Sequence, residues 1–361
     1  MAGPKETTLK EENTDNSGQS SKFKEILLSL PKTEIHLHLE GLVSFDSIWA
    51  LWEKNKLVSA DIRTKEDLLR RFQIKTLDEF IDVFINIIQH SFRTEDDLTY
   101  LINDAGEYFK KNNIVYSEIF FAPTKFLNSG FSFPRIVEIS TEGANLILNK
   151  YGVEIKYLID VSRTFGLENA MKNLNLVLEH KSDAIIGIGL GGSEKSGPSK
   201  NYEKVFQKAR EHGIHFVAHS GEDMGCKEID ETITYLNPER IGHGTSAIQN
   251  QELMNFIADY KTPLEVCPTS NLFTRKFVTN IENHPVKQFY ENNIFVTINS
   301  DDPSLFSTSL VDEYMLLYKK GIFSQNEILD LIKNNIYATF LTEDKKNSLW
   351  EKCNMIYNNK L

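Results

Sequence analysis

The segment TEIHLHLEG, residues 33–41, is an apolar run with two histidines and a glutamate at alternate positions. In an extended strand, side chains two residues apart point to the same face. His36, His38 and Glu40 would therefore share one face, and the apolar side chains the other. Imidazole nitrogen is a common zinc ligand, so the pattern suits two ligands of one metal ion. Taken alone, a half-exposed strand with two histidines is the simpler interpretation, and the rest of the chain must supply the other ligands.

Seven further runs have the β-branched and apolar composition of buried strands. They are residues 114–123, 153–161, 184–192, 215–222, 240–244, 263–271 and 294–302. Stretches with helical periodicity lie between most of them. This alternation predicts an α/β fold, a closed TIM-like (β/α)8 barrel, with a doubly wound open sheet as the alternative.

Two long segments depart from simple strand–helix alternation. Residues 44–113 follow the first strand and residues 303–361 follow the last, and both are mostly helical in pattern. They predict a helical insert after the first strand and extra C-terminal helices. We expect the insert to form a lid over the barrel mouth, because barrel enzymes often use such loops to exclude water. Candidates for its apolar face are Trp49, Phe80, Phe84 and Ile87, of which a minority should contact a ligand.

Composition limits the classes of protein to consider. The chain has 361 residues, of which 40% are apolar and 25% charged, as expected for a globular protein with a sizeable core. Its net charge of −11 argues against nucleic-acid or anionic-membrane partners, and no apolar run approaches the ~20 residues that span a bilayer. Three widely spaced cysteines suit a reducing compartment, so we expect a cytoplasmic protein.

The polar segment at residues 1–22 has no apolar core of a signal peptide, and we expect it to be a disordered arm. Residues 23–361 are expected to form one domain.

Polar, potentially reactive side chains follow the predicted strands at their carboxyl ends, where barrel enzymes place their active sites. Closing the barrel would gather these residues around one mouth. Three histidines and one carboxylate would then form a zinc site with room for water. Imidazole and carboxylate are also compatible with iron or manganese, and no sulfur ligand is expected nearby, but zinc is the favoured metal. The candidates are His36, His38, His219, Glu222, Asp223, His243, Asp301 and Asp302. His90, His180, His212, His215 and His284 are expected to be structural or surface residues.

Five motifs occur in the order HLHLEG, HSGED, RIGHG, LEVCPTSN and INSDDP. Together they resemble the adenosine deaminase family of the amidohydrolase superfamily, from about Leu30 to the region of Tyr314. The resemblance implies one zinc ion per chain, held by His36, His38, His219 and Asp301. It also implies hydrolytic deamination of a 6-aminopurine, in which the metal activates a water for attack at C6.

The resemblance assigns the remaining roles residue by residue. Glu222 would supply the proton to purine N1 and should therefore have a raised pKa. His243 would orient the attacking water, and Asp302 would contact that water and purine N7. The backbone of Gly192 would meet N3, and Glu40 would lie near the ribose 5′ position.

The fourth strand departs from the family pattern. Typical members have an aspartate where this chain has Gly189, in the sequence GLGGSE. We expect its loss to make room and to remove a charge near the ligand. A purine nucleoside, either adenosine or a 5′-modified analogue such as 6-amino-6-deoxyfutalosine, is then the preferred substrate.

Two alternatives stay open. Adenine deaminases also carry HLEG, but they usually have an aspartate where this chain has Gly191, so we expect free adenine to be a poor substrate. A non-catalytic, growth-factor-like relative would be expected to have a signal peptide and to have lost a ligand or the Glu222 carboxylate.

Overall fold

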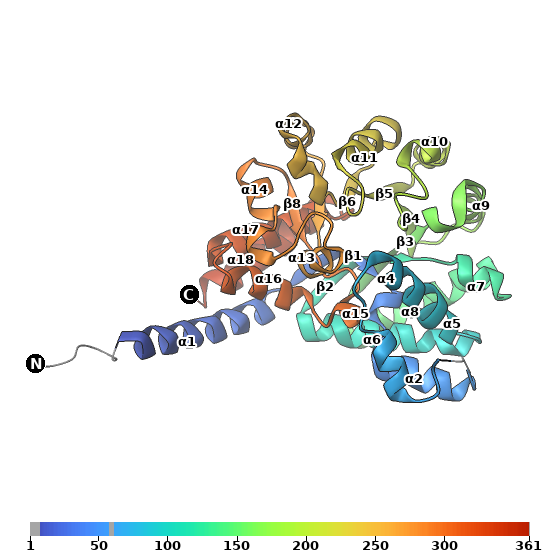
Figure 1. Cartoon of the computed structure of the whole chain (residues 1–361), viewed down its shortest axis with the longest axis horizontal. Coiled ribbons are helices and arrows are strands. Elements are labelled where there is room, and N and C mark those ends of the chain that lie inside the picture. The colour runs from blue at the N-terminus through green and yellow to red at the C-terminus, as the bar shows by residue number, and fades with distance from the viewer. Residues whose placement is uncertain (1–7, 58–60, 361) are drawn as a thin grey trace, which may run out of the picture.

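The computed structural model describes residues 8–57 and 61–360, without the side chains of residues 8–17 and Leu77. In this part of the chain, eight parallel strands form one sheet in the order β1 to β8, with helices around it (Figure 1). The predicted TIM-like (β/α)8 barrel is thereby confirmed. The strands are β1 (Lys32–His38), β2 (Ile114–Phe121), β3 (Glu154–Asp160), β4 (Ile185–Leu190), β5 (His215–Ser220), β6 (Arg240–His243), β7 (Leu264–Val266) and β8 (Val296–Ile298).

Most strands end earlier than their apolar runs predicted. The clearest difference is at residues 263–271, where only Leu264–Val266 is a strand and Pro268–Thr274 forms helix α13. Pro268 has no N–H to give to a sheet and has a backbone angle suited to the first turn of a helix, which accounts for the switch. The residues released from the strand ends form the loops that carry the candidate site.

Helices cover the outside of the barrel because each has an apolar stripe that the strands bury. After β2 to β7 they are α7 (Thr124–Asn128), α8 (Phe133–Tyr151), α9 (Gly166–Glu179), α10 (Glu203–Glu211), α11 (Cys226–Glu231), α12 (Gln251–Tyr260), α13 and α14 (Val286–Glu291). After β8 come α15 (Pro303–Phe306), α16 (Leu310–Lys319), α17 (Gln325–Ala338) and α18 (Glu343–Asn358), which are the expected extra C-terminal helices.

The barrel closes where β1 meets β8. His38 donates its backbone N–H to the carbonyl of Asp301 at 3.0 Å, and Asp301 donates its own to the carbonyl of His36 at 3.1 Å. The Asn299 side chain completes the junction, since its Oδ1 accepts from the backbone N–H groups of Ile35 and His36. The side chain of Glu34 also spans the junction, since its Oε1 accepts from the backbone N–H and the hydroxyl of Ser300 at 2.8 and 2.7 Å.

The helical insert after β1 contains α2 (Phe45–Lys54), α3 (Lys65–Arg71), α4 (Leu77–Val83), the π-helical turn Phe84–Ile88, α5 (Gln89–Ser91) and α6 (Leu98–Asn112). Only part of it covers the mouth. The segment from α4 to Gln89 supplies Phe80, Phe84 and Gln89 to the wall of the central pocket, whereas α6 packs against α8 on the side of the barrel. Of the four candidate lid residues, Phe80 and Phe84 line the pocket, while Trp49 and Ile87 pack in the core.

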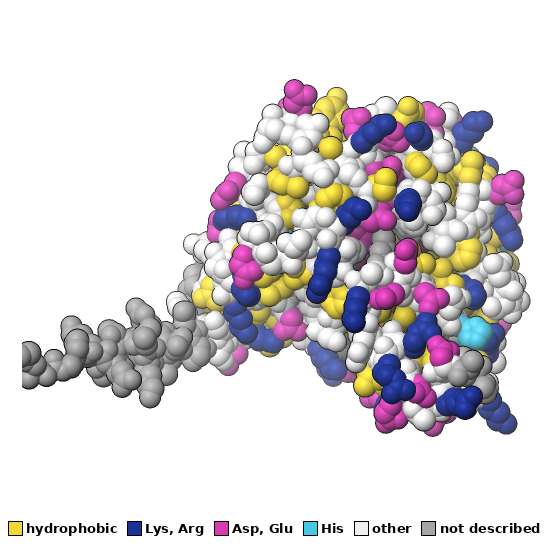
Figure 2. All heavy atoms as spheres, viewed as in Figure 1, with side chains coloured by type: hydrophobic (Ala, Val, Ile, Leu, Met, Phe, Trp, Pro, Cys, Tyr) yellow, Lys and Arg dark blue, Asp and Glu magenta, His cyan; other side chains and the backbone are white. Residues whose placement is uncertain are grey.

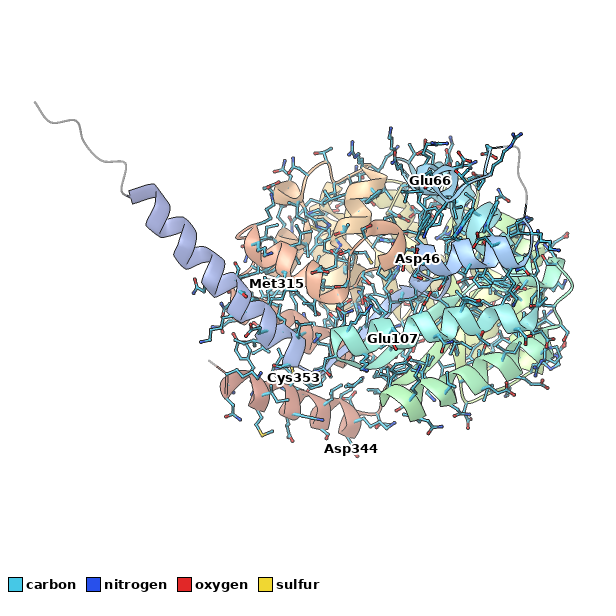
Figure 3. All side chains as sticks on the ribbon, turned by 90° about the horizontal axis from the view of Figure 1, so that it is seen from below. Asp46, Glu66, Glu107, Met315, Asp344 and Cys353 are labelled. Carbon is cyan, nitrogen blue, oxygen red and sulfur yellow. The ribbon has the colours of Figure 1, made fainter. Side chains whose placement is uncertain are left out.

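At the N-terminal end, helix α1 (Thr8–Ser29) projects from the body, and its C-terminal half lies against α16 (Figure 3). Phe23, Ile26 and Leu27 are buried there, and Lys24 pairs with Asp312 at 2.8 Å. The expected boundary at residue 22 falls inside this helix, and residues 1–7 lie outside the described part. Disorder of residues 1–22 stays a prediction.

Two observations bear on possible partners. Within the residues the structure describes, no helix has both the length and the apolar character needed to cross a bilayer. On the face shown in Figure 2, acidic and basic side chains are interspersed, and no continuous basic surface covers it.

Candidate active site and metal centre

The carboxyl ends of the strands bring the predicted site residues to one pocket. Its wall includes His38 from β1, Gly192 after β4, His219 and Glu222 from β5 and its loop, His243 from β6, and Asp301 and Asp302 after β8. The lid closes the other side with Phe80, Ile81, Phe84, Ile85 and Gln89. Residues separated by more than half the chain therefore meet because the barrel is closed.

Three of these residues, together with His36 behind the wall, bring their donor atoms close enough to hold one metal ion. His38 Nε2 lies 3.2 Å from His219 Nε2 and 3.4 Å from Asp301 Oδ1, and His36 Nε2 lies 3.4 Å from the same oxygen. Donor atoms of His36, His38, His219 and Asp301 all fall within 4.8 Å of one another. Ligands about 2.1 Å from a tetrahedral zinc ion lie about 3.4 Å apart, so the spacing fits such an ion.

The hydrogen bonds also leave the right atoms free. His36 donates from Nδ1 to Glu265 Oε2 at 2.7 Å, which leaves the lone pair of Nε2 pointing into the cluster. This Nε2 atom is buried and has no hydrogen-bond partner among the described residues. A buried polar atom without a partner is costly, and a metal ion at this point would satisfy it.

A second set of four donors includes a sulfur atom, which the sequence did not lead us to expect. Cys267 lies with His36, His243 and Asp301 within the same 4.8 Å limit. However, its thiol faces the carbonyl of Glu265 at 3.7 Å, and burial raises the pKa of Cys267 well above its usual value. A protonated thiol is a poor ligand, so the set with three histidines is favoured.

Behind the metal cluster lies a buried network of charges that sequence reasoning missed. Arg240 pairs with Glu265 and with Glu118, and its Nη1 atom lies 2.7 Å from Glu118 Oε2. All three side chains are almost fully buried. Glu265 in turn holds His36, so the network fixes the orientation of a ligand. The signal was present in RIGHG and LEVCPTSN, but a single sequence does not show which motif residue pairs with which.

Two site residues have left-handed backbones, which side chains other than glycine rarely adopt. His243 has a φ of 62° and Asp301 a φ of 65°. Such positions are often strained and are retained at functional sites. Beside them, Gly242 must lack a side chain, because a Cβ atom there would lie 2.7 Å from Cε1 of His36.

His243 is held in one tautomer by its neighbour. The Asn271 amide nitrogen lies 3.1 Å from His243 Nδ1, and Asn271 Oδ1 lies 3.3 Å from Nε2 of the buried His284. Because an amide N–H donates to Nδ1, the proton of the neutral imidazole sits on Nε2, which faces Glu222 Oε2 at 3.5 Å. Burial lowers the pKa of His243 to about 3, which keeps this ring neutral.

Glu222 and Asp302 are carboxyl groups in a water-poor environment. Burial, followed by the nearby charge of Asp301, raises the pKa of both well above the usual value. Each therefore keeps its proton to a higher pH than an exposed carboxyl group does. The Oδ1 atom of Asp302 is buried without a partner in the described chain, and a Cβ atom at Gly41 would lie 2.1 Å from it. Gly41 thus makes room for this carboxyl group.

Glu40 is fully buried and is not part of the pocket wall. Its Oε1 accepts from Gln89 Nε2 at 2.9 Å and from the backbone N–H of Ala122 at 3.2 Å. Gln89 lines the pocket in its place, so the structure puts Glu40 behind Gln89. Asp223, a further candidate at the β5 end, is not among the pocket-lining residues.

The interpretation of Gly189 needs correction. A Cβ atom at this position would lie 2.6 Å from the ring of Phe120, so the glycine accommodates that ring in the barrel interior and does not enlarge the pocket. The expected loss of a charge near the ligand is also wrong, because the pocket has a carboxylate in this region. Asp160, at the end of β3, lines it and accepts the N–H of Gly191 at 2.9 Å.

The comparisons with known proteins agree with this geometry. The family model described as adenosine deaminase matches residues 31–356. The chain belongs to the adenosine deaminase family. It is 30% identical to an adenine deaminase of Psychrobacter cryohalolentis over 328 residues, covering 89% of this chain and 96% of that protein. It is also 30% identical to an aminodeoxyfutalosine deaminase of Streptomyces avermitilis over 319 residues, covering 87% and 88% respectively.

Among solved structures, the adenine deaminase from Arthrobacter aurescens superposes with a TM-score of 0.85 at 27% identity, covering 91% of this chain and 99% of that one. Like other adenosine deaminase family members, the protein is a hydrolase acting on C–N bonds. Its activity is deamination of a purine.

Proposed function

We propose that the protein hydrolyses a 6-aminopurine nucleoside, adenosine or a 5′-modified analogue, to the 6-oxopurine nucleoside and ammonia. The observation that carries the proposal is the convergence of four candidate metal donors with the buried carboxyl group of Glu222, whose pKa burial raises. Metal donors alone would suit many hydrolases. A neutral carboxyl group beside them suits a substrate whose ring nitrogen must gain a proton.

His36, His38, His219 and Asp301 would hold the metal, which we propose to be one zinc ion per chain, since three imidazoles and one carboxylate form a typical zinc donor set. When bound, zinc lowers the pKa of a water so that it can attack at neutral pH. The buried side chains of Glu265 and Arg240 would act only by orienting His36, because neither of them reaches the pocket wall.

The protein side chains would then guide the atoms of the reaction. The Nε2–H of His243 orients the attacking water toward C6 of the purine. As the C6–O bond forms, Glu222 transfers its proton to N1, which takes up the electrons released from the ring. Asp302 contacts the water and purine N7, and the backbone N–H of Gly192 meets N3. One proton of the water passes to the amino nitrogen, and the other restores the carboxyl group of Glu222. The C6–N bond then breaks as ammonia leaves, the C6–O bond becomes a carbonyl, and N1 of the product keeps the proton that Glu222 supplied.

Free adenine is the second candidate substrate. It is favoured by the names of several relatives and by Asp160, since a pocket with a carboxylate can hold a small polar base. A non-catalytic role has less support, because the metal donors, Glu222 and the pocket are all in place.

The test is a substrate panel with purified protein of known metal content. Adenosine, 2′-deoxyadenosine, adenine, 5′-methylthioadenosine and aminodeoxyfutalosine are compared by ammonia release and by the change in purine absorbance. We expect the highest kcat/KM for a nucleoside. A kcat/KM for adenine equal to or above that for every nucleoside would favour the second candidate, and no turnover of any 6-aminopurine would overturn the proposal.

A further inference from the structure

The pocket has a second polar region, distinct from the metal cluster, at the carboxyl end of β3. Asp160 ends this strand and is only 6% exposed, yet it lines the pocket. Ser162 and Thr164 follow it on the same wall. None of these three residues has a role in the proposed mechanism.

The two oxygens of Asp160 have different surroundings. Oδ1 accepts backbone N–H groups from Ser162 at 2.8 Å and from Gly191 at 2.9 Å, which anchors the carboxyl group. From the residues that the structure describes, Oδ2 accepts no hydrogen bond. The nearby guanidinium of Arg163 does not pair with it, since Arg163 is bound to Glu228 and to carbonyl oxygens, among them that of His219.

The backbone around Asp160 determines where its Oδ2 atom lies. A Cβ atom at Gly191 would lie 2.9 Å from Asp160 Oδ2, so the absence of a side chain at this position leaves room for the carboxylate. Ser162 has a left-handed backbone, with a φ of 54°, which turns the chain sharply after Asp160. Oδ2 has no partner in the described chain and lies on a residue that lines the pocket, so a donor from a ligand can reach it. Such a bond to a charged oxygen is stronger than one between neutral groups.

The position of Asp160 relative to the substrate follows from the proposed function, on which this inference rests. If C6 faces the metal donors, N1 faces Glu222 and N7 faces Asp302, then N3 and N9 are the ring atoms directed away from the metal. Gly192 is the proposed partner of N3, and Asp160 is bound to the residue just before it. The sugar leaves the ring at N9, next to N3, and therefore passes Asp160.

We propose that Asp160 Oδ2 accepts a hydrogen bond from a 2′- or 3′-hydroxyl of the substrate's ribose, and that Asp160 thereby selects ribonucleosides. The hydroxyl groups of Ser162 and Thr164 add polar lining to the same wall. A site built to bond a hydroxyl group discriminates strongly against an analogue that lacks it, because the buried partner is then left unpaired.

The experiment compares the wild type with Asp160→Asn on adenosine, 2′-deoxyadenosine, 3′-deoxyadenosine and adenine. Asparagine keeps an acceptor for the two backbone N–H groups but replaces the free oxygen with a donor. Asp104→Asn is the matched control, since Asp104 also accepts a backbone N–H, from Ser44 at 2.8 Å, but lies outside the pocket wall. Metal content and melting temperature are measured for each protein.

We expect Asp160→Asn to lower kcat/KM for adenosine by about 10- to 100-fold, the range for a hydrogen bond to a charged group. The loss should be much smaller for the deoxynucleoside that lacks the bonded hydroxyl, and adenine should change less than about threefold. The control should leave the order of substrates unchanged. Independently of any variant, the wild type should prefer adenosine to that same deoxynucleoside by about 10-fold or more.

Other outcomes have distinct meanings. Equal losses on all four substrates, or no loss, would overturn the role of Asp160 while leaving the deaminase function intact. A loss largest for adenine would mean that the carboxylate faces N9–H, which would also overturn the ribose contact. If Asp160→Asn does not fold, the wild-type comparison decides, and equal wild-type kcat/KM values for adenosine and both deoxynucleosides would refute the proposal. Failure of the wild type on every 6-aminopurine would instead refute the proposed function.

Discussion

The backbone N–H of Glu222 donates a hydrogen bond of 2.9 Å to Oε1 of Glu194. The other oxygen of the same carboxylate accepts the N–H groups of Gly221 and Met224, each at 3.1 Å. Glu194 is 2% exposed and lies in the loop after β4. A single buried carboxylate therefore holds the loop that presents Glu222 to the pocket, although Glu194 does not line the pocket itself.

Replacing Glu194 with glutamine should lower kcat by about 10-fold while leaving metal content unchanged. The glutamine amide has only one acceptor oxygen. Its NH2 group would face a backbone N–H and could not accept a hydrogen bond from it, so the loop would lose a bond worth about 1–1.5 kcal/mol. Steady-state kinetics and metal analysis test this. A positioning role predicts that kcat falls more than KM rises, and an unchanged kcat would contradict it. Glu231→Gln is the control, since Glu231 pairs only with surface lysines 200 and 227 in the described chain.

Glu222→Gln should abolish turnover without affecting folding or metal binding. Glutamine keeps the shape of the side chain but has no acidic proton for N1, and assistance by a general acid is typically worth 10²–10⁴-fold. The wild type should also lose activity as pH rises and Glu222 deprotonates, because its raised pKa keeps the active, protonated form at lower pH. Single-turnover rates of both proteins across pH test this, and near-wild-type turnover of the variant would remove Glu222 from the mechanism.

The purified protein should contain about one divalent metal per chain, and its removal by a chelator should abolish activity and lower the melting temperature. The double variant His36→Ala with His219→Ala should lose the metal, because it deletes two of four ligands. His212→Ala is the control, since this histidine is exposed and its ring bonds only the carbonyl of Lys208 among the described residues. Full occupancy in the double variant, or an active metal-free protein, would refute the site.

Phe84→Ala should raise KM and lower kcat/KM by about 10-fold, because the ring lines the pocket and stands edge-on to His38, with 6.1 Å between centroids. Phe72 provides a matched control in the same insert, where it packs edge-on against Phe45 outside the pocket wall. Phe72→Ala should lower the melting temperature and leave KM unchanged. If both variants change KM equally, the segment does not act as a lid on the substrate.

The barrel was predictable because its strands are buried on both faces and so form nearly continuous apolar runs. The ends of the strands were not predictable, because apolar residues continue beyond the last backbone hydrogen bond between neighbouring strands. In the segment after β7, Cys267 and Pro268 extend the run that began with the strand, yet the chain turns into α13. Proline was the local signal for that change.

The clustering of the candidate metal ligands was predictable because each motif is local and its place at a strand end follows from the fold. The contacts between residues of different strands were not predictable from the sequence. Asp160 accepts a hydrogen bond from the N–H of Gly191, which lies 31 positions further along the chain. The ring of Phe120 packs against Gly189, and these two residues belong to strands that are not neighbours in the sheet. Both reverse the interpretation of the glycine-rich segment, in which Gly189 was expected to make room and to remove a charge near the ligand.

The candidate metal ligands lie at the junction between β1 and β8, so metal binding would affect how the protein assembles. His36 and His38 belong to the first strand and Asp301 follows the last, so a bound ion would add to the backbone bonds and to the Asn299 and Glu34 side chains that join these two edges. During synthesis, the first ligands emerge long before the last one. A high-affinity site therefore cannot form until all eight strands have left the ribosome, and metal loading would follow closure of the barrel.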